Sequence, residues 1–193
     1  PAPGWSAPYP LLATVGSDDG GAMWLLNLEQ AGHTVVVGHT AAESLIRHVA
    51  AELILDPWAL HVRVDVVGIA DELTGLDPIR FQHHTESDRA FLDQHAAQLA
   101  ASARTEDEPE QFHTLVAAKA IPTSDLEPIA QIITDQPGRS GAALVTLGPV
   151  GDGSGFVLDL TDGRLRIPAL GLDLDPAGLT PSEARTCAAI VEV

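Results

Sequence analysis

Histidines and carboxylates are the residues of this sequence that could hold a metal ion. The chain has 8 histidines and 27 Asp and Glu residues. His83 and His84 are adjacent, but neighbours on a strand point to opposite faces and do not readily chelate one ion. Two other groupings are possible, namely His84 with Glu86 and Asp88, and His33 with His39. No two histidines have the helical i, i+4 spacing of a zinc protease. We interpret them as ordinary polar or partly buried side chains, with a metal site as the alternative.

Asp71 and Glu72 form an adjacent carboxylate pair directly after an apolar run. Open α/β sheets place their sites at the carboxyl ends of strands, so the pair could act as catalytic carboxylates. Acidic residues are also common in the first turn of a helix, where they complement the helix dipole. We favour the second interpretation.

The sequence contains neither a complete dinucleotide-binding loop nor a serine nucleophile motif. Residues 151–155 resemble a dinucleotide-binding loop, but Phe156 takes the place of the third glycine and a strand follows instead of a helix. Neither Ser140 nor Ser154 lies in a Gly-x-Ser-x-Gly elbow. Cys187 falls within an amphipathic segment, so we expect it to pack as a small apolar side chain. We expect Trp58 to cover the core, with a partner contact as the alternative.

The charge of the chain narrows the class of partner. Ten Lys and Arg residues against 27 Asp and Glu give a formal net charge of −17, and Lys119 is the single lysine. Nucleic acids and anionic membranes are bound through Lys and Arg, so both are excluded as main partners. Arg164 and Arg166 alternate along a strand, and we expect them to form ion pairs with acidic side chains.

The compartment and the domain boundaries follow from simple counts. A single cysteine allows no internal disulfide and no cysteine zinc site, which is consistent with a reducing, cytoplasmic setting. No stretch of about 18 apolar residues could span a membrane. Four prolines lie within residues 1–10, which we interpret as the end of a linker from a longer protein. Residues 11–193 are then a single domain.

Apolar periodicity predicts the elements of the first half. Residues 11–15 and 23–28 flank an Asp/Gly cluster and predict a β-hairpin. The run at 33–38 predicts a buried parallel strand, and residues 41–55 an amphipathic helix capped by Thr40. The remaining elements expected here are a strand at 61–68, a helical turn at 71–76, an edge strand at 79–83 and a helix from residue 85 to about 104.

The second half repeats the alternation of strand and helix. We expect strands at 112–118 and 141–147 around a helix at 124–135, with Ser124 and Glu127 as its capping box. Asp162-Gly163 predicts a hairpin of residues 156–160 and 164–167, followed by a short strand at 170–174. Thr180, Pro181 and Glu183 begin a last helix. The fold class is α/β, a three-layer sandwich with a mostly parallel sheet and antiparallel hairpins near both ends.

The order of these elements resembles the front half of an FtsK-type P-loop ATPase, the family of DNA translocases and type VII secretion motors. The resemblance rests on the strand ending in Val35-Val36-Val37-Gly38, the helix after it, the strand at 61–68 and the stretch Glu72-Leu73-Thr74-Gly75-Leu76. It implies a P-loop-like sheet, with a nucleotide at the Gly38 end.

The phosphate-binding motif itself is not present. A working loop reads Gly-x-x-x-x-Gly-Lys-Ser/Thr. Counted from Gly38, Glu43 replaces the second glycine, Ser44 the lysine and Leu45 the hydroxyl residue. A carboxylate ~4 Å from a phosphate would cost about 4 kcal/mol at an effective dielectric near 20. The strand at 112–118 has no acid at its end for Mg²⁺, so we expect no ATPase activity, cofactor or metal.

A second resemblance concerns the whole arrangement, with its late hairpin and terminal helix. It is similar to a region of large actinobacterial proteins that also carry membrane segments, a LysM module and a bacterial transcriptional-activator (BTAD) domain. The resemblance implies an interior domain of such a protein.

We therefore expect a non-catalytic interaction or scaffolding domain that contacts a protein partner or a second copy of itself. The alternative is a ligand-sensing domain with a pocket at the strand ends around Gly38, His39, Gly68 and Asp71. An enzyme with an unrecognised site is the third interpretation.

Overall fold

The computed structural model describes residues 9–57, 59–103, 111–118, 121–136, 140–148 and 155–191. Several sequence interpretations concern residues outside these ranges, namely most of the proline-rich start, Trp58, Lys119 and most of the glycine-rich stretch at 151–155. The described chain forms one sheet of ten strands, in the order β2-β1-β10-β9-β8-β3-β7-β6-β4-β5. No helix in the described part is long and apolar enough to cross a membrane.

The parallel half of the sheet carries the core. Six strands run parallel here: β8 (Phe156–Asp159), β3 (His33–Val37), β7 (Ala142–Leu147), β6 (Phe112–Ala117), β4 (Val62–Val67) and β5 (Phe81–His84). The central strands are buried on both faces, which explains their continuous apolar sequences. The strand expected at 79–83 is β5 and lies at the sheet edge, as predicted.

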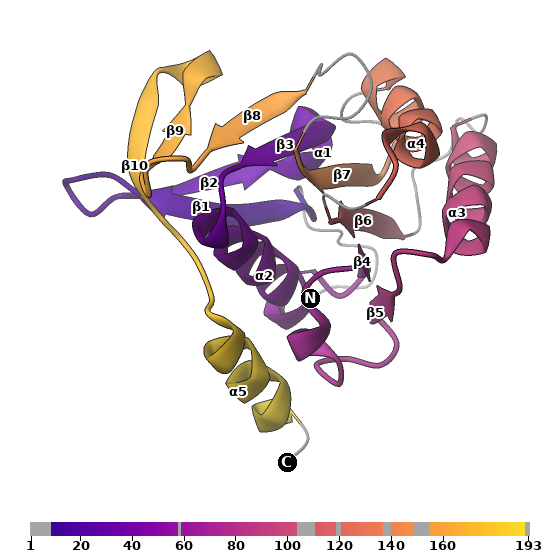
Figure 1. Ribbon diagram of the computed structural model, residues 1–193, viewed down its shortest axis with the longest axis horizontal. Coiled ribbons are helices and arrows are strands. Elements are labelled where there is room, and N and C mark those ends of the chain that lie inside the picture. The colour runs from indigo at the N-terminus through magenta and orange to yellow at the C-terminus, as the bar shows by residue number, and fades with distance from the viewer. Residues whose placement is uncertain are drawn as a thin grey trace, which may run out of the picture.

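Two layers of helices cover this half of the sheet (Figure 1). Helix α2 (Thr40–Leu55) packs on one face, and α3 (Arg89–Ser102) with α4 (Thr123–Asp135) on the other. Alternation along β4 serves both layers, since Val64 and Val66 belong to the α2-side core and Val67 to the other. The predicted three-layer sandwich is confirmed.

The strands joined by α2 are not neighbours in the sheet. β7 and β6 both lie between β3 and β4. The chain therefore passes from β3 to β4 first, and the two strands between them are added from later parts of the sequence. A one-turn 3-10 helix, η1 (Asp71–Leu73), follows β4, as expected for the helical turn at 71–76.

The antiparallel part consists of the two expected hairpin regions. β1 (Leu12–Ser17) pairs with β2 (Met23–Asn27), and β8 leads through β9 (Leu165–Ile167) to β10 (Leu172–Pro176). The two regions meet where Gly16 pairs with Pro176. A side chain on Gly16 would overlap the carbonyl oxygen of Asp175, so this junction requires glycine.

Three predicted helix starts are wrong, and each error concerns a cap. α2 begins at Thr40 itself, with His39 before it and no side-chain cap. α3 begins at Arg89 rather than at residue 85, because Asp88 accepts a hydrogen bond from the Phe91 amide. α4 begins at Thr123, and Ser124 does not cap it.

The last helix, α5 (Pro181–Val191), begins as predicted. Thr180 Oγ1 accepts a hydrogen bond from the Glu183 amide at 3.3 Å, and the Glu183 carboxylate accepts one from the Thr180 amide at 2.8 Å. Cys187 is half-buried against the α2-side core, as expected of a small apolar side chain. α5 packs on α2 and η1.

Glu52 joins the N-terminal hairpin to α2. Its carboxylate accepts hydrogen bonds of 2.7 Å from both the amide and the hydroxyl of Thr14. Burial alone would raise the pKa of Glu52, but the hydrogen bonds from His48 and Thr14 lower it overall. The carboxylate is therefore held ionised between the strand and the helix.

We expect Glu52→Ala to lower the free energy of unfolding by about 1–3 kcal/mol, because the partly buried Thr14 amide loses its acceptor. Urea denaturation measures this loss. Glu127→Ala removes an exposed carboxylate from α4 and should change stability by less than about 0.5 kcal/mol. Equal effects of the two substitutions would contradict this role of Glu52.

Candidate functional site

The connection from β3 to α2 lies where an ATPase would carry its phosphate loop. β3 ends at Val37 and α2 begins at Thr40, so only Gly38 and His39 join them. Gly38 has a φ of +141°, and a Cβ there would lie 3.1 Å from the carbonyl carbon of Leu160. The Leu160 amide donates to the Val37 carbonyl at 2.7 Å. The backbone at Leu160 therefore continues the pairing of β8 with β3 up to Gly38 and leaves no room for a side chain there.

Ser44, at the counted lysine position, belongs to the body of α2. The Leu179 amide donates to the Ser44 carbonyl at 2.9 Å, and a Cβ on Gly178 would lie 3.1 Å from Ser44 Cβ. The segment between β10 and α5 thus covers Ser44. Glu43, at the second glycine position, is exposed and pairs with Arg47 at 3.4 Å.

Arg47 forms an ion pair with Glu72, one of the two residues of the predicted carboxylate pair Asp71–Glu72. Its side chain is buried, and Nε lies 3.2 Å from each carboxylate oxygen of Glu72. Burial raises the pKa of Glu72, but hydrogen bonds from its own backbone and from Arg47 lower it overall. Glu72 therefore fixes η1 against α2 as an ionised partner of Arg47 and is not free to act as a general acid.

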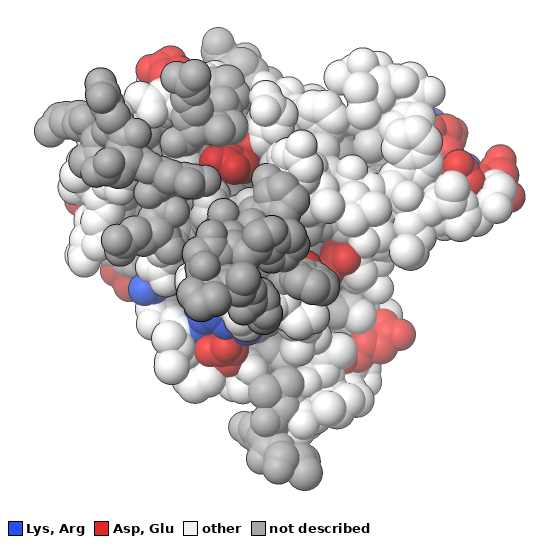
Figure 2. Space-filling model, turned by 180° about the vertical axis from the view of Figure 1, so that it is seen from behind, with Lys and Arg blue, Asp and Glu red and all other residues white. Residues whose placement is uncertain are grey.

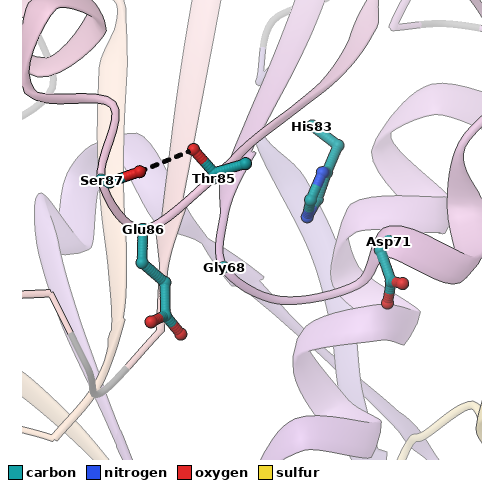
Figure 3. Close-up of a pocket in the computed structure, with 6 residues that line it drawn as sticks. All are labelled: Gly68, Asp71, His83, Thr85, Glu86 and Ser87. Carbon is teal, nitrogen blue, oxygen red and sulfur yellow. Dashed lines mark hydrogen bonds between the residues drawn. The ribbon is translucent and has the colours of Figure 1, made fainter.

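A polar pocket of about 560 Å³ opens beyond the carboxyl ends of β4 and β5 (Figure 3). It is lined by Gly68, Asp71, His83, Thr85, Glu86 and Ser87. Of the four residues expected to surround a ligand, Gly68 and Asp71 line this pocket, whereas Gly38 and His39 do not. This pocket therefore shares two of the four residues named by the alternative interpretation, and ligand binding there stays a prediction.

Backbone geometry after β4 shapes this pocket. Gly68 has a φ of +68°, and a side chain there would overlap the Glu86 side chain. Ala70 also adopts a left-handed conformation, with φ of +59°, which costs roughly 1–2 kcal/mol for a residue with a Cβ. These two residues turn the chain sharply from β4 into η1. The turn brings Asp71 to the rim of the pocket.

The chemistry of the pocket suits cations and hydroxyl groups. In Figure 3 the His83 ring points between Gly68 and Asp71, while Glu86 lies on the other side of Gly68. Thr85 and Ser87 share a hydrogen bond of 3.2 Å between their hydroxyls. The lining has two carboxylates and no lysine or arginine, so a phosphate would be repelled. Across the described residues, no group of three or more His, Cys, Asp or Glu is placed to hold a metal ion.

His83 and His84 point to opposite faces of β5, as predicted. His83 faces the pocket, whereas His84 Nε2 lies 2.9 Å from an oxygen of the buried Asp65. Arg63 Nε contacts the other Asp65 oxygen at 2.9 Å. Of the candidate groupings, the structure brings His84 and Asp88 together, with His84 Nδ1 3.7 Å from an Asp88 carboxylate oxygen, and Asp88 also caps α3. The buried His33 instead lies 3.0 Å from the Thr146 hydroxyl.

His84, which contacts Asp65, belongs to a cluster of rings that we did not predict from the sequence. His84 stacks on Phe91 with centroids 3.6 Å apart, and Phe91 lies 5.6 Å from His95. His95 in turn meets His113 of β6 edge-on at 6.0 Å. The cluster fills the space between α3 and the sheet.

Burial sets the ionisation of two of these histidines. It lowers the pKa of His95 to about 4, and the Asp65 carboxylate opposes this only in part. Burial likewise lowers the pKa of His113. Both rings are therefore neutral at pH 7, and protonating either one would place an extra cation beside Arg63. The cluster packs against β5, the strand whose His83 lines the pocket.

Comparisons with known proteins identify the fold. No protein-family model and no curated protein matches the chain. Among solved structures, the cytoplasmic domain of the type VII secretion ATPase EccC from Thermomonospora curvata superposes with a TM-score of 0.65 at 15% identity, over 88% of this chain and 26% of that one. The chain has the fold of an ATPase domain. It spans about a quarter of that EccC structure.

Two further solved structures have the same fold. EccC ATPases 2 and 3, in complex with a signal sequence peptide, match with a TM-score of 0.67 at 14% identity, over 93% of this chain and 42% of that one. The pCW3 conjugation coupling protein TcpA, with ATPγS, matches with a TM-score of 0.58 at 10% identity, over 96% of this chain and 73% of that one. The chain thus shares its fold with domains of secretion and conjugation proteins.

The histidine cluster predicts how stability depends on pH. A histidine whose pKa is lower in the folded chain binds its proton more readily when unfolded, so stability falls with decreasing pH through the window between about 6.5 and 4. Each such histidine removes at most about 1.4 kcal/mol per pH unit in this window. We expect His95→Phe to reduce the difference in unfolding free energy between pH 7 and pH 5 by about 1–2 kcal/mol.

Chemical denaturation at both pH values measures this difference. His61 is exposed at the other end of β4, and His61→Gln should leave the pH dependence unchanged. An unaltered pH dependence in His95→Phe would show that His95 is not neutral in the folded chain.

Proposed function

We propose that this chain is a non-hydrolysing interaction domain that keeps an ATPase-type fold. The observation that carries the proposal is the two-residue connection between β3 and α2. A phosphate-binding loop needs several backbone amides that are free to surround the phosphates. Here the Ala42 and Glu43 amides donate to the His39 carbonyl at 3.0 and 3.2 Å within the first turn of α2. These amides are not available to a phosphate.

The side chains around the connection support the same proposal. The position that needs a lysine is Ser44, which is covered by Gly178 and Leu179. The nearby Arg47 is engaged by Glu43 and Glu72. With a net charge of −17 and these pairings, a tetraanionic nucleotide would meet no compensating charge at this end of the sheet.

Protein recognition is the activity that remains for such a domain. EccC ATPases 2 and 3, part of which this chain matches in fold, form a complex with a signal sequence peptide. We propose that the present chain also works by contacting another protein, as a domain of a longer actinobacterial protein and on the cytoplasmic side. Negative charge would attract a basic partner and raise its rate of encounter.

The second candidate function is binding of a small ligand in the pocket at Gly68. Its two carboxylates, imidazole and hydroxyls favour an amine or a polyhydroxyl compound. A domain with both properties could report on that ligand through its protein contact.

We expect Mg–ATP to leave the melting temperature of the chain unchanged. Saturation at 100 times a dissociation constant would add about 2.7 kcal/mol, which a thermal-shift measurement detects easily. The double substitution Glu43→Gly/Ser44→Lys restores the two key residue types, yet it should not create nucleotide binding, because both positions lie within α2. A clear upward shift with Mg–ATP in the natural chain would overturn the proposed function.

The pocket is tested with a triamine. We expect spermidine to raise the melting temperature, and Asp71→Asn/Glu86→Gln to abolish most of that shift, because the two carboxylates line the pocket. Asp93→Asn/Glu127→Gln removes the same amount of charge from exposed positions on α3 and α4 and should retain the shift. Equal losses in both double variants would show non-specific attraction and exclude the pocket as the amine site.

A further inference from the structure

The strand β2 forms one edge of the ten-stranded sheet. It pairs with β1 on one side, and no strand of the described residues pairs with its other side. An open strand edge presents a row of backbone donors and acceptors that can pair with another chain. The opposite edge, β5, is polar and half-buried, so the two edges are chemically different.

The exposed side chains of β2 are apolar. Met23 is 70% exposed, Trp24 38% and Leu25 50%, and these are consecutive residues. Alternation along the strand places Met23 and Leu25 on the same face. Proteins usually protect such edges with charged residues or proline, and the sequence Met-Trp-Leu-Leu-Asn of β2 contains neither. This edge is therefore open to strand addition.

The tip of the β1–β2 hairpin and the neighbouring β10 carry an excess of negative charge. Figure 2 shows the acidic side chains gathered at the projecting end of the molecule. Asp19, Asp173 and Asp175 all pair with one guanidinium, that of Arg164, and Arg166 pairs with Asp162 and Asp173. Asp18 accepts hydrogen bonds from Gly20 and Ala22 at the same turn. Four carboxylates thus pair with two guanidinium groups, and a fifth, that of Asp18, accepts hydrogen bonds from backbone amides and the Trp24 indole without a cationic partner among the described residues.

The charge excess decides between possible occupants. A second copy of this chain would bring another −17 to the edge, and the like charges of the two hairpin tips would repel. A basic segment would instead gain from the uncompensated carboxylates beside Met23. The apolar strand and the acidic tip therefore favour the same partner, an extended segment with alternating apolar residues and a basic end.

We propose that the outer edge of β2 receives such a segment from another protein as an added strand of the sheet. Backbone hydrogen bonds would give the affinity, and Met23 and Leu25 would pack against the alternate side chains of the segment. Lys or Arg at its end would lie against the Asp18–Asp19 turn. This inference rests on the proposed function as an interaction domain and names the surface that carries it.

The experiment uses a fluorescent peptide of sequence Lys-Arg-Val-Thr-Val-Thr-Val and measures its anisotropy with the full chain. We expect saturable binding, and a loss of at least about tenfold in affinity for Met23→Thr/Leu25→Thr, since burying one large apolar side chain is worth more than about 1.4 kcal/mol. Threonine keeps the strand propensity, and a thermal melt verifies the fold. Asp19→Asn should weaken binding by about twofold to fivefold.

Two controls isolate the mode of binding. The same peptide N-methylated at alternate residues keeps its side chains and charges but cannot complete the ladder, so it should bind at least about tenfold more weakly. Ile79→Thr removes an apolar side chain that is 79% exposed at another part of the surface and should leave affinity unchanged.

The possible failures are distinguishable. Equal binding of the N-methylated peptide, or full binding by the Met23/Leu25 double variant, would overturn strand addition at β2 while leaving an interaction domain with another surface. Absence of peptide binding, together with a dimer that the double variant abolishes, would show that the edge pairs with a second copy. Stabilisation by Mg–ATP would overturn the proposed function without affecting the peptide result.

Discussion

The short turn from β3 into α2 is the constraint on which the functional account depends. Only Gly38 and His39 join the central strand to α2, and the backbone at Leu160 lies directly beside Gly38. In a sheet of this order the central strand would otherwise end in an open, anion-binding loop. Here the Ala42 and Glu43 amides donate to the His39 carbonyl, and the Leu179 amide of the C-terminal segment donates to the Ser44 carbonyl. The fold of an ATPase domain is thus combined with a two-residue connection after β3, which we propose does not accept a nucleotide.

The outer parts of the sheet differ sharply from this closed centre. At the β5 edge, the left-handed residues Gly68 and Ala70 shape a polar pocket, and His84 of the same strand belongs to the ring cluster with Phe91 and His95. At the β2 edge, an apolar strand with an acidic tip projects from the body. Glu52 and the Gly16 junction hold that projecting hairpin to the core. The features that we propose for recognition thus lie at the two edges of the sheet, away from the connection between β3 and α2.

Local chemistry determined how much could be predicted from the sequence. Periods of two and 3.6 residues located the strands and long helices, and Asp162-Gly163 and Thr180 with Glu183 marked a turn and a cap that depend on near neighbours alone. Strand order was not predictable, because β7 and β6 enter between β3 and β4 from distant sequence. For the same reason, Asp71 was placed in a pocket without Thr85 and Ser87, and the pairing of Arg47 with Glu72 and the ring cluster around His95 were missed.

Amide hydrogen exchange over residues 38–44 and at Leu179, with and without Mg–ATP, tests the central claim most directly. If the connection is closed as described, the Ala42, Glu43 and Leu179 amides exchange slowly, because each is hydrogen-bonded within the chain, and nucleotide changes none of these rates. Fast exchange of Ala42 and Glu43 that Mg–ATP slows would reveal an open phosphate-binding loop and contradict the account.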